Sequence, residues 1–261
     1  MIFFEQIKKH ALSLICIVGL SIIGISPLFH SGLYSAHDIW HQVARLYHYS
    51  QSTIDGQFPP SWVSNMANGY GYPLFIFSYH FPWMVGLPFI LLGIGVIPTL
   101  KLLFALGFIF SGISFYILAY TLTERKFPAV IGSVLYLFAP YHFLSMYVSA
   151  SIGSVFLFVL LPVVMVGVIK ILQGKYVSGV TITAVAAAAM ILNHLMSIAI
   201  FFPFLLILVI GFGAKYVQST QRVIRATTAL LIAAIVTFLL TIFYLVPLVT
   251  YLPLTQAIEK G

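Results

Sequence analysis

The chain has 261 residues, of which 61% are hydrophobic and only 7% are charged, and its mean hydropathy is +1.09. This composition excludes an ordinary soluble domain. The apolar runs are continuous and about 20 residues long, so they predict an all-α, polytopic integral membrane protein rather than a β-barrel of alternating strands. The net charge of +7 comes from basic residues beside apolar runs, which is a topological use of Lys and Arg and predicts no nucleic-acid partner.

The first apolar run, residues 11–29, follows Lys8 and Lys9. It has the length of a membrane span and exceeds the apolar core of most secretory signals. We therefore predict an uncleaved anchor with its N-terminus in the cytoplasm, with cleavage at Ser35-Ala36 as the alternative. The single cysteine, Cys16, lies in this run and has no partner for an intrachain disulfide.

The next segment opens with the stretch AHDIWHQVARLYHYSQSTIDGQFPPSW, residues 36–62, which holds two of the five acidic residues. Read as a helix, residues 38–55 place Trp40, Tyr47 and Ile54 on one side. This pattern predicts an amphipathic helix lying on the outer membrane surface. Asp38 stands at the start of this helix, where it is either a simple N-cap or a functional carboxylate.

The pentapeptide HDIWH has the spacing of the zinc motif H-E-x-x-H, with Asp in place of Glu. On a helix, His37 and His41 would face one metal ion and Asp38 would lie beside them. Aspartate reaches a metal-bound water less well than glutamate, and no spacing marks a third protein ligand. The favoured prediction is therefore a site without metal, and a divalent metal ion at these three residues is the weaker alternative.

Residues 73–97 are apolar but contain Pro73, Pro82 and Pro88, each of which removes a helix hydrogen-bond donor. We predict that this segment lies in the outer interface or re-enters the membrane. The fold is then a single transmembrane domain, 1–261, with about seven transmembrane helices. Amphipathic and re-entrant helices fill a large first outer loop, 30–98. The later candidate spans are 99–122, 127–147, 154–172, 177–193, 196–214 and 226–248.

The basic residues support this topology, because cytoplasmic loops carry an excess of Lys and Arg. Nine basic residues fall inside: Lys8, Lys9, Arg125, Lys126, Lys170, Lys175, Lys215, Arg222 and Arg225. Three fall outside: Arg45, Lys101 and Lys260. If residues 73–97 crossed the membrane, the later loops would change sides and most basic residues would lie outside.

The same topology gathers the polar chemistry on the outer side. Asp38, Asp55 and seven of the eight histidines fall at outer ends of spans or in the outer loop: His30, His37, His41, His48, His80, His142 and His194. Each histidine alone is most simply an interfacial anchor. Their clustering with two carboxylates favours a functional site, since ionisable groups at membrane depth are costly to keep.

Several segments, in this order, resemble a known membrane family. They are HDIWHQVARLYHY, then DGQFPPSWVSNMANGYGYPLFIFSYHFPWMVGLP, APYHFLSMYV and LNHLMS. This order resembles the membrane family labelled 6-pyruvoyl-tetrahydropterin synthase-related, although no residue here suggests pterin chemistry. More broadly, it is similar to the C-type membrane glycosyltransferases (GT-C), which take sugars from polyprenyl-phosphate donors. The match covers most of the chain, and GQFPPSW…NGYGYPLF is its most specific part.

The resemblance implies an inverting transfer on the outer face of a bacterial or archaeal plasma membrane. Asp38 occupies the position of the acidic residue that acts on the acceptor, so it is the implied catalytic base. The implied partners are membrane lipid and a polyprenyl-phosphate-linked sugar, whose phosphate calls for basic or hydrogen-bonding side chains. The candidate substrate-binding residues are His37, His41, Arg45, His80, Lys101, His142 and His194.

The chain departs from the family pattern after the PYH segment. Ser149 and Ser154 stand where family members carry an Arg and a Glu. The loss of that charged pair supports a second hypothesis, a non-catalytic flippase or carrier of lipid-linked sugars. Relatives continue with further spans and an outer domain, so the chain is expected to be an N-terminal fragment or a minimal member. A structural membrane subunit is the third hypothesis.

Overall fold

The computed structural model describes the backbone of residues 2–255, with side chains from Lys9 onward except at 197 and 198. Lys260, predicted to lie outside the membrane, and the end of the predicted 1–261 domain fall outside the described residues. The helices are α1 (Ile2–Ile25), α2 (Ile39–Ile54), α3 (Leu74–Phe77), α4 (Phe81–Leu91), α5 (Val96–Thr123), α6 (Lys126–Leu137), α7 (Pro140–Phe143), α8 (Ile152–Leu172), α9 (Tyr176–Asn193), α10 (Leu195–Tyr216) and α11 (Thr220–Tyr251).

Among residues 2–255, six helices are long and apolar enough to cross a membrane: α1, α5, α8, α9, α10 and α11. A further pair, α6 and α7 with its π-helical continuation to Val148, is bent by 44° at the break before Pro140 and adds a seventh if it counts as one span. The protein is therefore an all-α, polytopic membrane protein, as its composition predicts.

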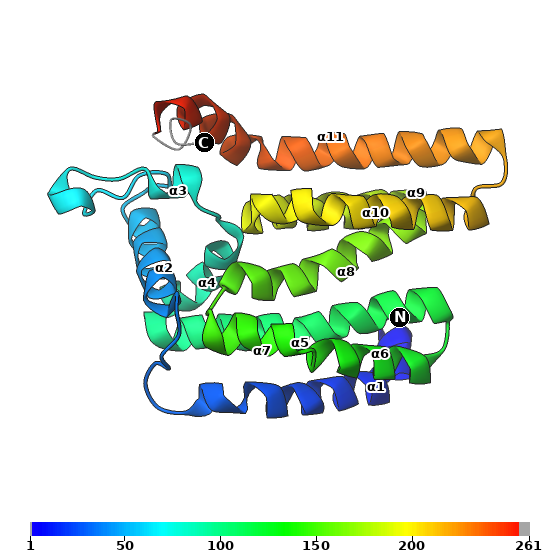
Figure 1. Cartoon of the computed structure of the whole chain (residues 1–261), viewed down its shortest axis with the longest axis horizontal. Coiled ribbons are helices and arrows are strands. Elements are labelled where there is room, and N and C mark those ends of the chain that lie inside the picture. The colour runs from blue at the N-terminus through cyan, green and yellow to red at the C-terminus, as the bar shows by residue number, and fades with distance from the viewer. Residues whose placement is uncertain (1, 256–261) are drawn as a thin grey trace.

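The long helices lie side by side, and α2 runs crosswise at one of their ends (Figure 1). Helix α2 buries Ile39, Leu46 and Tyr49 against the protein. Its other side exposes Trp40 and Ile54, at 68% and 59% of their surface. One protein-facing side and one exposed apolar side are what a helix at a membrane surface requires.

The proline-containing segment 73–97 holds two short helices, α3 and α4, and the start of α5. Pro82 occupies the first turn of α4, where a missing N–H costs little, and Pro88 lies inside it. Neither α3 nor α4 has the length of a span. Helix α4 packs against α2 and α5, so it holds the crosswise helix against the bundle.

Helices α8 and α9 approach so closely that their backbones touch. A Cβ atom on Gly167 would lie 2.7 Å from the backbone nitrogen of Thr183, and one on Gly179 would lie 2.8 Å from that of Ile171. Small residues at such crossings let membrane helices pack by direct van der Waals contact. Helix α11 joins the same packing through Thr237, whose hydroxyl donates to the carbonyl of Ala184 at 3.3 Å.

The two ends of the bundle differ in chemistry. The turns α5–α6, α8–α9 and α10–α11 lie together at the end opposite α2 (Figure 1). These turns and their flanking helix ends carry most of the basic residues: Arg125, Lys126, Lys170, Lys175, Lys215, Arg222 and Arg225. Asp38 and Asp55 bound the crosswise helix α2 at the other end.

Candidate functional site

Asp38 is held at the start of α2 by its backbone rather than by its side chain. The N–H groups of His37 and Asp38 donate to the carbonyls of Val148 and Ser149, at 2.9 and 3.0 Å. Asp38 occupies the N-cap position as predicted, yet its carboxylate makes no capping bond. The side chain of Asp38 therefore does not serve as a helix N-cap, and its carboxylate is available for another role.

The carboxylate of Asp38 meets the neighbouring imidazole instead. His37 Nδ1 lies 2.8 Å from Asp38 Oδ1, an ion pair when the ring is protonated. The two side chains are 84% and 39% exposed, so a substrate hydroxyl can reach the carboxylate. A carboxylate with an exposed oxygen beside an imidazole can accept a proton from such a group.

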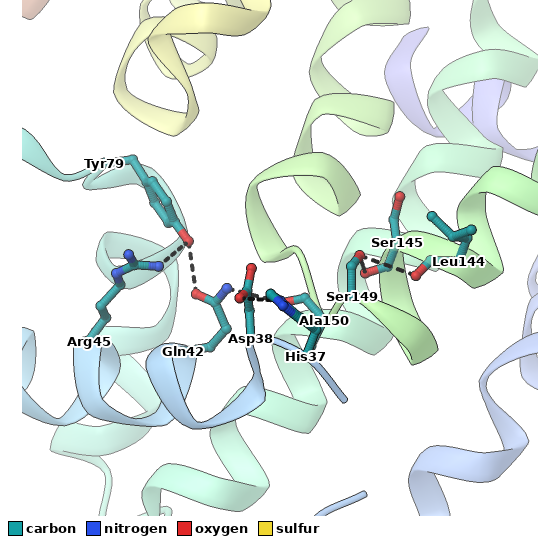
Figure 2. Close-up of polar contacts among 9 residues, drawn as sticks. All are labelled: His37, Asp38, Gln42, Arg45, Tyr79, Leu144, Ser145, Ser149 and Ala150. Carbon is teal, nitrogen blue, oxygen red and sulfur yellow. Dashed lines mark hydrogen bonds and ion pairs between the residues drawn. The ribbon is translucent and has the colours of Figure 1, made fainter. Parts of the chain in front are cut away.

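A buried hydrogen-bond chain links the start of α2 to the loop before α4 (Figure 2). Gln42 donates through Nε2 to the carbonyl of Ala150 at 3.0 Å and accepts from the hydroxyl of Tyr79 at 2.8 Å. Arg45 Nη1 donates to the same hydroxyl at 3.3 Å. The chain thus fixes one cation, Arg45, on the same helix as Asp38.

The ring of Tyr79 is itself tightly held. It stacks on the Trp83 ring, with the two ring centroids 5.5 Å apart. The guanidinium of Arg45 lies over the Tyr79 ring, 5.4 Å from its centroid, and makes a cation–π contact. Burial raises the pKa of Tyr79, so its hydroxyl stays protonated and donates to Gln42. This anchoring fixes the position of Arg45 without an acidic partner among the residues whose side chains the structure describes.

The turn between the π-helical segment and α8 forms another wall of the site. Ala150 adopts a positive φ of 51°, and the hydroxyls of Ser151 and Ser154 lie 2.9 Å apart. Asn193 donates to the carbonyl of Gly153 at 2.7 Å, which docks the α9–α10 junction on this turn. His194 follows at that junction, with its ring centroid 6.4 Å from that of Tyr79.

The structure therefore brings together Asp38, His37, Arg45 and His194 from the predicted site. It places the other candidates elsewhere. His41 is exposed on α2, and Lys101 donates to the carbonyl of His30 at 2.6 Å. His142 is buried in the bundle with its ring stacked on Phe158 at 3.9 Å.

His80 lies in an aromatic box formed by Tyr49, Phe75, Phe243 and Tyr244 and is 2% exposed. Burial lowers the pKa of His80 from 6.5 to about 4, although a hydrogen bond with the backbone of Phe75 opposes this change. The ring is thus neutral in the folded protein. Its environment is that of a packed core residue and not of a phosphate ligand.

This burial predicts an acid-dependent loss of stability. Unfolding returns His80 to its ordinary pKa, so protonation favours the unfolded state as the pH falls from 6.5 towards 4. The stabilisation lost is at most about 3 kcal/mol, at 1.36 kcal/mol per pKa unit. The melting temperature in detergent is measured at pH 7.5 and at pH 4.5. The decrease between the two pH values should be smaller for His80→Gln than for the wild type. His30→Gln, at an exposed position, should show the same decrease in melting temperature as the wild type. Equal decreases in the two variants would refute the proposal that the buried ring of His80 causes this acid-dependent loss of stability.

The metal hypothesis requires His37 and His41 on one helix face. Helix α2 begins at Ile39, so His37 precedes it, and the i, i+4 geometry predicted from HDIWH is wrong. Among the described residues, no group of three or more His, Cys, Asp or Glu side chains is placed to hold a metal ion. His37 and Asp38 alone do not supply the ligand set of a zinc site.

Two residues of the site, Gln42 and Tyr79, are absent from the sequence-based prediction. Gln42 is one turn after Asp38, and Tyr79 immediately precedes His80. Their pairing across 37 positions depends on how α2 packs on α4. The only local signal is that Gln42 falls on the buried side of the amphipathic helix.

Comparison of the chain with protein-family models, curated proteins and solved structures finds no match.

Proposed function

We propose that the protein is a GT-C-like membrane glycosyltransferase that moves a sugar from a polyprenyl-phosphate donor to an acceptor. The observation that carries this proposal is the partly exposed carboxylate of Asp38 at the start of α2, with the cation Arg45 held by Tyr79 two turns further along the same helix (Figure 2). A base and an anion-stabilising group at the membrane surface are what transfer from a lipid phosphate needs.

In this mechanism Asp38 accepts the proton of the acceptor hydroxyl. The acceptor oxygen then bonds to the anomeric carbon from the face opposite the phosphate, and the bond between that carbon and the phosphate oxygen breaks. The electron pair leaves with the polyprenyl phosphate. Arg45, oriented by Tyr79, stabilises the charge on this leaving group.

The proposal includes a topology. With the bent pair α6–α7 counted as one span, the chain crosses the membrane seven times, its N-terminus lies in the cytoplasm, and α3 and α4 belong to a re-entrant outer loop. The separation of the basic turns from α2, which begins directly after Asp38, supports this orientation, because Lys and Arg are retained on the cytoplasmic side (Figure 1). In this topology the site faces outward. The proposed membrane is the bacterial or archaeal plasma membrane that the resemblance implies.

A transfer assay tests the proposal. The purified protein, reconstituted in liposomes with a panel of tritiated monosaccharides on polyprenyl phosphate, is mixed with a membrane extract as the source of acceptor. We expect enzyme-dependent release of polyprenyl phosphate and labelling of one acceptor fraction. Saturable binding of a donor without turnover across the panel would contradict the proposal and support a carrier. Ser149, whose carbonyl accepts the backbone N–H of Asp38, favours that second function. It is uncharged, whereas the family that the chain resembles carries a charged residue at this position.

A further inference from the structure

An open groove lies between the first two turns of α9 and residues 224–232 of α11, towards the basic end of the bundle. Its volume is about 480 Å³, and its walls are formed by residues of α9 and α11 alone. The lining includes Val180, Ile224 and Ile232, and a single charged side chain, Arg225, projects into this apolar surface. The first turns of α9 and α11 are remote from α2, which begins directly after Asp38 and runs crosswise at the opposite end of the bundle (Figure 1).

The groove has a charged end and an apolar end. Arg225 lies in the second turn of α11, and Ile232 lies seven residues further along the same helix. At 1.5 Å per residue, these positions are about 10 Å apart along the helix. Thr181 and Thr228 add hydroxyls between the apolar side chains. A ligand that fits this order has an anionic head and a hydrocarbon tail.

The charge around the groove lacks an internal counterion. No Asp or Glu occurs between Glu124 and Glu259, whereas five basic residues lie at the helix ends nearby: Lys170, Lys175, Lys215, Arg222 and Arg225. Arg222 donates to the carbonyl of Tyr216 at 3.3 Å. Arg225 makes no hydrogen bond or ion pair with any residue that the structure describes. An unpaired guanidinium in an apolar groove attracts a phosphate group.

We propose that this groove binds an anionic phospholipid of the surrounding leaflet, with its phosphate on Arg225 and an acyl chain between α9 and α11. The lipid supplies the negative charge that residues 125–258 lack. It also fills the gap beside the close contact of α11 with Ala184. Basic pockets between transmembrane helices bind lipid headgroups by this chemistry.

Native mass spectrometry of the detergent-purified full chain tests the proposal. Titration with dioleoylphosphatidylglycerol should show tighter binding than titration with dioleoylphosphatidylcholine. Arg225→Gln should weaken phosphatidylglycerol binding about fivefold, the effect of one basic residue near an anionic headgroup. Phosphatidylcholine binding should weaken less, because the positive charge of choline offsets that of its phosphate. Arg222→Gln removes the same charge one turn away, outside the groove, and should keep the wild-type preference. Equal losses in both variants, or no preference in the wild type, would overturn the proposal.

A second variant tests the acyl chain independently of charge. Thr181 is exposed in the groove, so Thr181→Trp fills the space without burying a new group in the core. It should reduce tight binding of both lipids by severalfold. Undiminished phosphatidylglycerol binding by Thr181→Trp would show that the lipid is held without the groove and would overturn this part of the assignment. This result stands even if Arg225→Gln fails to fold.

Discussion

Asp38→Asn is expected to lower the rate of sugar transfer at least a hundredfold in the reconstituted assay. Asparagine keeps the shape of the side chain but cannot take the acceptor proton, and a positioned general base contributes about 10²- to 10⁴-fold. The backbone N–H groups of residues 37 and 38 fix this segment, and neither bond involves the carboxylate. The variant should therefore fold and retain binding of the lipid-linked donor.

Asp55→Asn is the matched control for this experiment. Asp55 ends the same helix at its C-cap and accepts a hydrogen bond from Gln51 Nε2 at 3.1 Å. The control removes the same charge from the same surface without touching the proposed base. Transfer by Asp55→Asn should stay within about twofold of the wild type. Full activity of Asp38→Asn, or equal losses in the two variants, would remove the proposed role of Asp38.

Gly167→Ala is expected to destabilise the bundle by about 3 kcal/mol. The added methyl group would overlap the Thr183 hydroxyl and lie 2.7 Å from the Thr183 backbone nitrogen. Backbone cannot rotate away as a flexible side chain can, so α8 and α9 must separate and lose contacts along their length. Overpacking of a well-packed site costs about 1 to 3 kcal/mol, and this position lies at the upper end because the obstacle is main chain.

Thermal unfolding in detergent measures this effect, and Gly211→Ala provides the comparison. Gly211 also lies inside a long helix, α10, but a Cβ atom there would meet nothing within 4 Å. Because alanine favours the helix over glycine by up to about 1 kcal/mol, this control should be neutral or slightly more stable. A Gly167→Ala protein as stable as the control would show that the two helices are not in backbone contact.

The apolarity and length of the runs were sufficient to predict the long helices. The run at 154–172 corresponds to α8, and 177–193 corresponds to α9, with differences of one or two residues at the ends. Proline commonly bends or ends a helix, and the chain bends before Pro140. Pro162, Pro203 and Pro247 lie inside α8, α10 and α11, and none of these helices ends at its proline. Neighbouring helices allow proline within a membrane span, and a single sequence does not reveal those neighbours.

The candidate site was predictable only in its acidic centre. Asp38 could be found because it is one of very few carboxylates in an apolar chain. The link from Tyr79 through Gln42 to Ala150 joins three segments by side-chain hydrogen bonds, and no local pattern encodes such a link. His80 and His142 lie among packed aromatic rings. The sequence alone does not distinguish such a histidine from one at a binding site, because both have apolar neighbours in the chain.

The long helices also differ in how much of each is enclosed by protein. In α8, 67% of the apolar window is buried, whereas in α10 only 6% is buried. Lipid tails adapt to any side-chain shape, so α10 can exchange one apolar residue for another at little cost. The centre of the bundle has no such freedom, because a single added or lost methylene in a close-packed interior is felt. Substitutions should therefore accumulate in α10 during evolution, whereas the buried positions of α8 should change least.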